Sequence, residues 1–191
     1  KPADNQAGEA GLKSAFMRIN DQLEEMACEN WDVEYKGESG KVLYDVEGSY
    51  HDVLAGQVVS VIQDNLVIDY TAHASRENRI DSLVFDAKTG GIYHLSDLFI
   101  DDYDWRDQLL LPATESYKAY CNTQGLAQDP QVLKSLQKRL TRRTPFSVDK
   151  EGLTIYVAYN DDTAFMPVTI IYKDLNVYLD KEATIWSAIN K

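Results

Sequence analysis

Acidic side chains gather at two places where several carboxylate oxygens could meet one ligand. The segments are residues 101–104, with Asp101 and Asp102, and residues 160–162, with Asp161 and Asp162. Hard oxygen ligands suit calcium, but neither segment has the central glycine and the distal glutamate of an EF-hand loop. Two carboxylates could also cleave a glycosidic bond, and these four residues define a glycan-active enzyme as one alternative. Because 31 acidic residues make chance pairs common, we predict no metal site and no catalytic residue here.

The sequence strings that mark common catalytic sites are missing from the chain. It contains no GxSxG, no GxxxxGK[ST] and no HExxH, which disfavours the hydrolases, phosphate-loop proteins and zinc proteases that use them. His51, His73 and His94 fall on predicted strands or strand ends, where a hydrogen-bonded surface histidine is commoner than a catalytic base. Cys28 and Cys121 cannot form a CxxC pair, and they remain either two buried thiols or one disulfide. We therefore expect no cofactor and no enzymatic activity.

The charge of the chain indicates which kinds of partner it can bind. A formal net charge of −12 argues against nucleic acid, because affinity for the phosphate backbone requires a cationic surface. Ten acids stand against two lysines between residues 21 and 52, whereas residues 131–145 carry five basic residues and no acid. Such a field can steer a cationic partner, and the alternative is a solvated face that opposes aggregation. The acids are Asp21, Glu24, Glu25, Glu29, Asp32, Glu34, Glu38, Asp45, Glu47 and Asp52.

Apolar periodicity and capping residues predict the helices that would position these groups. Apolar residues recur at spacings of four and three from Leu12 to Met26, which predicts an amphipathic helix with one face on a sheet. Asp129 and Pro130 are the N-cap and first position of a second helix. Between them, residues 105–120 predict helical segments interrupted at Pro112.

Alternating segments predict antiparallel strands. Residues 57–63 and 66–71 flank Asp64-Asn65, a pair that suits a two-residue hairpin turn. Residues 83–86 and 92–95 form a second hairpin through the turn 88–91, and two closing strands cover 153–159 and 168–172. The predicted fold is α+β, with antiparallel sheets and helices packed on one face. We expect a single module over 11–191, with halves 11–80 and 81–191 as the alternative.

The first ten residues are polar and lack an initiating methionine. We interpret residues 1–10 as a tether that followed an export signal or a membrane anchor. No apolar run approaches the roughly 20 residues that cross a bilayer, so this segment is expected not to be transmembrane. The expected location is extracytoplasmic: periplasmic, secreted or anchored at the cell surface through an upstream segment.

Two parts of the sequence carry a family likeness. Residues 84–99, VFDAKTGGIYHLSDLF, resemble a segment of the bacterial extracytoplasmic domain of unknown function found in RsiV-type anti-sigma factors and PdaC-type peptidoglycan deacetylases. Residues 152–159 and 166–175 are similar to the closing strands of that domain, and residues 16–20 are similar to the domain that precedes it. Thr71 and Ala72 replace the family's glycines before His73, and Ala158 replaces its proline before Tyr159.

The resemblance implies a non-catalytic binding or sensing module of an exported bacterial protein. In the anti-sigma factor the domain binds lysozyme, and in the deacetylase it accompanies a separate catalytic domain. The expected ligand is therefore a basic protein such as lysozyme. The alternative partner is the cell-wall glycan peptidoglycan, because the chain holds twelve tyrosines that can serve as contact residues.

The predicted binding residues lie between the two closing strands. They are Tyr159, Asn160, Asp161, Asp162 and Phe165. Strand alternation stops at Tyr159 and resumes after Pro167, so this loop is free of pairing and can present aromatic and acidic groups together. The alternative is a solvated turn with Phe165 in the core.

Overall fold

Helices and antiparallel strands share the chain, which confirms the predicted α+β class. The computed structural model describes residues 3–28, 35–36, 42–70, 75–100, 104–141, 143–159 and 164–190. The helices are α1 (Ala3–Cys28), α2 (Trp105–Gln124), α3 (Pro130–Arg139), α4 (Tyr172–Leu175), α5 (Thr184–Ile189) and the 3₁₀ turn η1 (Leu95–Leu98). The strands are β1 (Tyr35–Lys36), β2 (Val42–Ala55), β3 (Val58–Asp69), β4 (Ser75–Asp86), β5 (Ile92–Tyr93), β6 (Phe146–Val148), β7 (Gly152–Tyr159) and β8 (Ala164–Ile171). Within these ranges they form antiparallel sheets β1-β2-β3-β4-β5 and β6-β7-β8.

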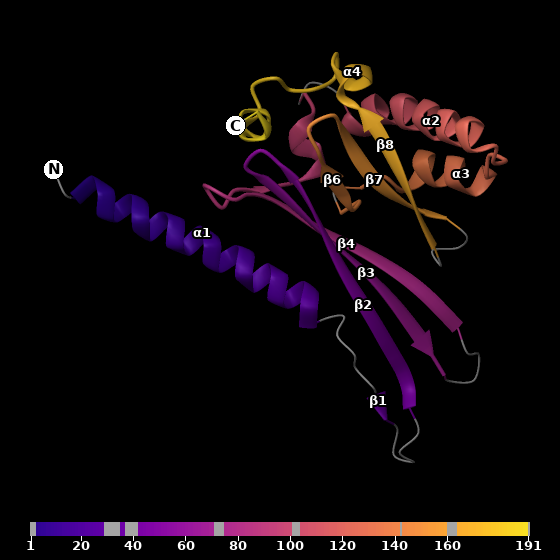
Figure 1. The fold of residues 1–191 in the computed structure, drawn as a ribbon, viewed down its shortest axis with the longest axis horizontal. Coiled ribbons are helices and arrows are strands. Elements are labelled where there is room, and N and C mark those ends of the chain that lie inside the picture. Colours follow the sequence, from indigo (N-terminus) through magenta and orange to yellow (C-terminus); the bar gives the residue numbers. More distant parts are fainter. Residues whose placement is uncertain are drawn as a thin grey trace.

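The long hairpin of the first sheet turns at Gly56, and the predicted turn at Asp64-Asn65 is wrong. Strands β2 and β3 pair along their whole length down to Ala55 opposite Val58, as Figure 1 shows. Gly56 has a φ of +59°, which a two-residue hairpin turn requires and glycine adopts without strain. Strand β3 continues through Asp64 and Asn65 because both residues are paired with β2 on one side and β4 on the other.

The second predicted hairpin, between β4 and β5, is confirmed. Gly90 has a φ of +69° in the connecting turn, and the Asp86 carboxylate accepts hydrogen bonds from the backbone N–H groups of Lys88 (2.7 Å) and Thr89 (3.0 Å). The chain then enters η1, where the Asp97 carboxylate accepts from the His94 N–H at 2.8 Å. These local bonds give the segment a fixed shape.

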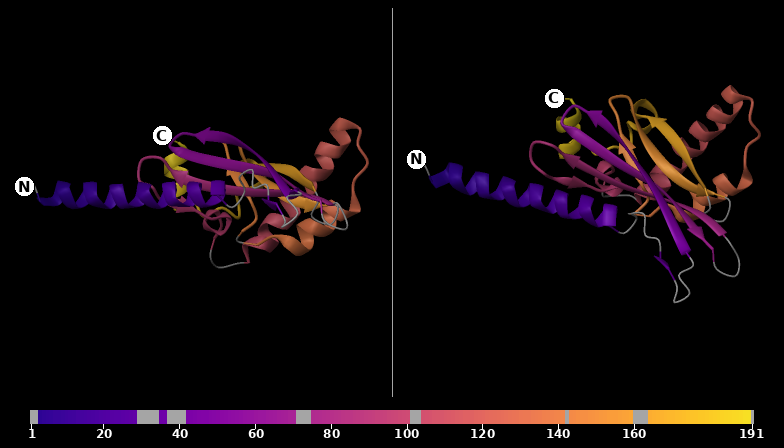
Figure 2. Two further views of the ribbon diagram at one scale, coloured as in Figure 1. Left: turned by 90° about the horizontal axis from the view of Figure 1, so that it is seen from below. Right: turned by 60° about the horizontal axis from the view of Figure 1, so that its bottom comes forward.

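Helix α1 packs on one face of the first sheet, as its periodicity predicts. Ile19 is buried with Leu83 and Phe85, and Leu23 and Met26 pack against this cluster. Ala15 approaches the β4–β5 turn so closely that glycine is required at position 90. The helix begins at Ala3, inside the segment expected to be a tether, and its N-terminal half extends away from the sheets (Figure 2).

Helices α2 and α3 pack on the second sheet and share its core. The buried side chains of β7 and β8 are Leu153, Ile155, Val157, Val168 and Ile170. Asp129 caps α3 as predicted, because its carboxylate accepts from the Gln131 N–H at 2.7 Å.

Pro112 lies inside a helix that the sequence predicted to be interrupted there, and Pro167 lies inside a strand that was predicted to begin after it. Helix α2 runs unbroken through Pro112, which corrects the predicted interruption. Proline removes one helical hydrogen bond, and the buried residues Leu109, Ala113 and Tyr117 hold the helix against the core. Strand β8 likewise contains Pro167. It is an edge strand, and an edge strand tolerates a missing N–H that would face solvent.

Two serines join the two sheets, Ser60, which is buried, and Ser82, which is half-buried. The Ser60 hydroxyl on β3 accepts from the Val148 N–H of β6 at 3.1 Å, and the Ser82 hydroxyl on β4 accepts from the Phe146 N–H at 2.9 Å. Apolar residues of both sheets and of α2, α3 and α5 belong to one core cluster. Among the described residues no helix is both long and apolar enough to span a bilayer.

Candidate functional site

A hollow lies where the β4–β5 hairpin meets the C-terminal segment. It has a volume of about 650 Å³ and is lined by Gln57, by parts of residues 86–93 and 97–99, and by parts of residues 180–187. We call it the hairpin pocket. A concave site of this size, formed by segments far apart in the sequence, is typical of binding sites in folded proteins.

Backbone hydrogen bonds hold the walls of the hairpin pocket together. The Gln57 N–H donates to the Ala188 carbonyl of α5 at 2.8 Å, and the Ala87 N–H donates to the Gln57 carbonyl at 2.7 Å. The Asp180 N–H donates to the Leu98 carbonyl at 3.0 Å. The β2–β3 turn, the β4–β5 turn, η1 and α5 are therefore fixed relative to one another, and the pocket is preformed.

Carboxylates dominate the charge of the pocket. Its described lining contains Asp86, Asp97 and Asp180, with Lys88 as the only basic residue among them. Asp86 is buried, with 6% of its surface exposed. All three carboxylates accept backbone N–H groups, and Asp180 accepts that of Glu182 at 3.0 Å. The oxygens are held in position by the turns that they cap, and the net negative charge suits a cationic group.

A buried phenol borders the carboxylates. Burial raises the pKa of Tyr93, a hydrogen bond to the Thr184 side chain opposes this shift, and the charge of Asp86 adds to it. The phenol therefore stays protonated at neutral pH and remains available as a hydrogen-bond donor.

The histidines, cysteines and carboxylates of the described residues do not gather into a metal-binding set. Among them, no group of three histidine, cysteine, aspartate or glutamate residues could hold a metal ion. His94 caps η1, and His51 lies 3.3 Å from the Tyr156 hydroxyl, measured from its Nε2 atom. Cys121 is a buried free thiol. His73, Asp101, Asp102 and the side chain of Cys28 lie outside the described residues.

Of the predicted binding residues between the two closing strands, the structure describes the side chain of Phe165 alone. Asn160, Asp161, Asp162 and the side chain of Tyr159 lie outside the described residues, so their proposed role stays a prediction. Phe165 lies in β8 opposite Ala158, which corrects the prediction that the chain is free of pairing up to Pro167. Its side chain is half-buried and lines a separate hollow of about 350 Å³. It is neither fully in the core nor fully exposed.

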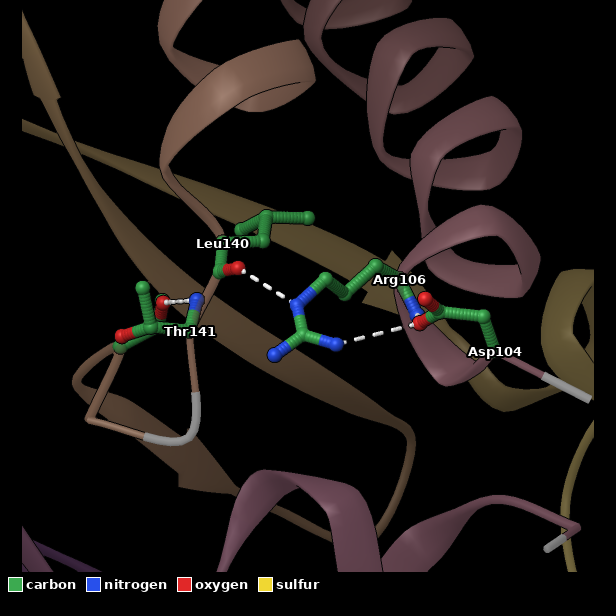
Figure 3. A network of polar contacts seen from close by, with 5 residues as sticks. Asp104, Arg106, Leu140 and Thr141 are labelled. Carbon is green, nitrogen blue, oxygen red and sulfur yellow. Dashed lines mark hydrogen bonds and ion pairs between the residues drawn. The ribbon is translucent and has the colours of Figure 1, made fainter.

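An arginine network holds Leu140, which also lines this hollow. The Arg106 Nε donates to the Leu140 carbonyl at 3.0 Å, and another guanidinium nitrogen donates to Asp104 at 3.3 Å. The same guanidinium lies 4.8 Å from the centre of the Trp105 ring. Figure 3 shows how Arg106 bridges the start of α2 and the end of α3, with Thr141 beyond it. The Arg106 contacts are structural, because they join helix ends.

The sequence predicted the hairpin that forms one half of the hairpin pocket, but it assigned no binding residue to either half. The segment 84–99 stood out through its resemblance and its turn residues, and it provides Asp86, Lys88 and Asp97. Residues 180–187 gave no periodic or motif signal. Their position follows from the pairing of Leu179 with Phe99, which is a contact between distant parts of the chain.

Comparison with known proteins identifies the fold. No protein-family model and no curated protein matches the chain. A crystal structure of a DUF3298 family protein from Pseudomonas aeruginosa is similar, with a TM-score of 0.53 and 14% identity over 72% of this chain and 63% of that protein. A DUF3298 family member from Bacteroides fragilis has a TM-score of 0.53 and 16% identity over 99% of this chain and 73% of that protein.

These likenesses place the chain among proteins that share the fold of a bacterial domain of unknown function. The chain spans less than two thirds of the length of the Pseudomonas protein. At 14% and 16% identity, the comparison establishes the fold alone.

Proposed function

We propose that this chain is a non-catalytic, extracytoplasmic binding or sensing module whose ligand is a basic protein such as lysozyme. The hairpin pocket receives a cationic side chain of that protein. The observation that carries the proposal is the preformed pocket with Asp86, Asp97 and Asp180 against one lysine. An extended lysine or arginine side chain fits within about 650 Å³.

Charge favours this ligand at two ranges. At long range, a net charge of −12 raises the rate at which a cationic protein meets the surface. At short range, a charge-assisted hydrogen bond contributes about 1.5–3 kcal/mol. The carboxylates are already oriented by backbone N–H groups, so binding requires little further ordering of the pocket.

The fold agrees with this proposal. The RsiV-type resemblance of residues 84–99 comes from the segment that forms the pocket, and the domain it resembles binds lysozyme. The non-catalytic role is supported by the Asp86, Asp97 and Asp180 carboxylates, which act as fixed acceptors for turns. The extracytoplasmic location follows from the same resemblance.

Calorimetric titration with hen lysozyme tests the proposal. We expect binding at low salt that weakens at physiological salt, because exposed charges are screened over about 8 Å. Asp97→Asn keeps the acceptor for the His94 N–H and removes one pocket charge. It should raise the Kd about tenfold, which corresponds to about 1.4 kcal/mol. The matched control is Asp64→Asn, which removes an exposed charge of β3 outside the pocket.

Three outcomes would contradict parts of the proposal. Absence of heat at low salt would exclude lysozyme as the ligand. Equal weakening by Asp97→Asn and Asp64→Asn would show that overall charge, rather than the pocket, attracts the protein. Equal affinity for cytochrome c, another small basic protein, would show that the surface does not distinguish among basic partners.

A further inference from the structure

A further hollow, distinct from the hairpin pocket and from the hollow lined by Phe165, lies beside α5. Its charged lining residues are basic, whereas those of the hairpin pocket are mostly acidic. It has a volume of about 340 Å³, and we call it the aromatic–lysine cleft. Its main lining residues are Tyr172, Lys173, Asn176, Lys181, Trp186 and Asn190. All of them lie in the described segment 164–190. Asp180 lines the hairpin pocket whereas Lys181 lines this cleft, so neighbouring residues serve separate sites.

The aromatic wall of the cleft is fixed in position. The rings of Tyr172 and Trp186 meet edge to face, with centroids 5.0 Å apart and planes at 85°. The Trp186 indole N–H donates to the Asp180 carbonyl at 2.6 Å, and the Tyr172 hydroxyl donates to the Asp149 carbonyl at 3.0 Å. Because both polar tips are bonded within the protein, the rings offer apolar π surface to a ligand. A pyranose ring presents C–H groups on its face that pack on such a surface.

The polar residues of the cleft indicate what that ring should carry. Asn190 donates its side-chain N–H to the Trp186 carbonyl at 2.9 Å, which leaves its amide oxygen to accept from a hydroxyl group. Lys173 and Lys181 are exposed, and the described lining of the cleft contains no acid. Two ammonium groups beside an aromatic wall complement a carboxylate.

We propose that the aromatic–lysine cleft binds a saccharide that carries a carboxylate. Nucleic acid is a poorer fit, because the net charge of −12 repels a dense polyanion whereas a pyranose with one carboxylate adds little repulsion. The two lysines exclude a cationic ligand. This inference does not rest on the proposed function, because the cleft and the hairpin pocket have different linings and opposite charges.

The test compares two sugars that differ in one group. Glucuronate carries a carboxylate where glucose carries a hydroxymethyl group. Each is titrated into ¹⁵N-labelled protein while the indole N–H signal of Trp186 is followed by NMR, with the Trp105 indole as an internal control. We expect glucuronate to shift the Trp186 signal with a Kd of about 1 mM, which is reasonable for a single small ring. Glucose should bind about two- to fivefold more weakly, which is the weakening expected when an exposed ion pair is lost.

Two lysine variants distinguish the effect of a positive charge in the cleft from that of a positive charge elsewhere on the protein. Lys181→Gln should weaken glucuronate binding and leave glucose binding unchanged, whereas Lys13→Gln, which removes an exposed charge of α1, should leave both unchanged. Absence of a Trp186 shift with glucuronate would overturn the proposal, and equal affinity for the two sugars would overturn the role of the carboxylate. An equal shift with sodium acetate would overturn the role of the saccharide ring.

Discussion

Replacing Gly56 by alanine tests how α5 is held against the β2–β3 turn and thereby how the hairpin pocket is formed. At position 56 a Cβ atom would lie 2.4 Å from the Ile189 carbonyl oxygen and 2.5 Å from that of Ala188. Both are backbone atoms, so no flexible side chain can move aside. The helix or the turn must shift by roughly 1 Å to restore an ordinary contact distance of about 3.5 Å.

The cost follows from three contributions. The φ of +59° makes alanine at position 56 less favourable than glycine by about 1 kcal/mol. The shift stretches the 2.8 Å hydrogen bond from the Gln57 N–H to the Ala188 carbonyl, whose loss costs about 1 kcal/mol. Imperfect packing of the buried residues Ile185 and Ile189 costs about 1 kcal/mol more. We expect Gly56→Ala to lower the free energy of unfolding by about 3 kcal/mol.

Gly125→Ala is the matched control. Gly125 also has a positive φ, +65°, but a Cβ atom there would meet nothing within 4 Å. This variant should lose only the backbone contribution of about 1 kcal/mol. Urea unfolding measures both variants, and the m-values should equal that of the parent protein. In addition, Gly56→Ala should weaken lysozyme binding while Gly125→Ala should not. Equal destabilisation by the two variants would refute the close contact with α5.

Three further predictions concern the contacts between the sheets, the N-cap of α3 and the fall in stability at alkaline pH. Ser60→Ala leaves the buried Val148 N–H without its acceptor and should cost about 2 kcal/mol in urea unfolding; a loss no larger than that of the exposed Ser49→Ala would contradict this role. Asp129→Ala removes the N-cap of α3 and should lower the free energy of unfolding by about 1 kcal/mol, with Asp129→Asn close to the parent; equal losses would refute capping. Burial, followed by the charge of Asp149, raises the pKa of Tyr172 far above its usual value. The folded state therefore holds this proton more tightly than the unfolded chain, so this contribution to stability is present below about pH 10 and is lost as the pH rises further. The free energy of unfolding should fall less steeply above about pH 10 in Tyr172→Phe than in the parent, and identical slopes would contradict the shift.

The elements that the sequence predicted correctly are those whose local signals agree with their tertiary surroundings. Helix α1 has an apolar face that is used against β4. The β4–β5 hairpin has Gly90 where a positive φ is needed, and α3 has Asp129 as its cap. The β2–β3 turn failed because Asp64-Asn65 suited a turn locally, whereas pairing with two neighbouring strands determined that β3 continues.

The candidate site was harder to predict from the sequence than the fold. A local pattern located the turn with Asp86 and Asp97, but it could not show that residues 180–187 close the pocket over them. That arrangement depends on the contact of Gly56 with α5 and on the bridge between Phe99 and Leu179. The aromatic–lysine cleft has the same origin, because Tyr172 and Trp186 meet only through tertiary packing.

Mapping the contact surface by NMR tests most directly whether the hairpin pocket binds a basic protein. Unlabelled lysozyme is added to ¹⁵N-labelled protein, and the backbone amide signals are compared with and without it. If lysozyme binds in the hairpin pocket, the largest changes should fall on Thr89, Gly91, Asp97 and Thr184, which line it. Changes concentrated around Phe165, or no changes at low salt, would contradict binding in this pocket.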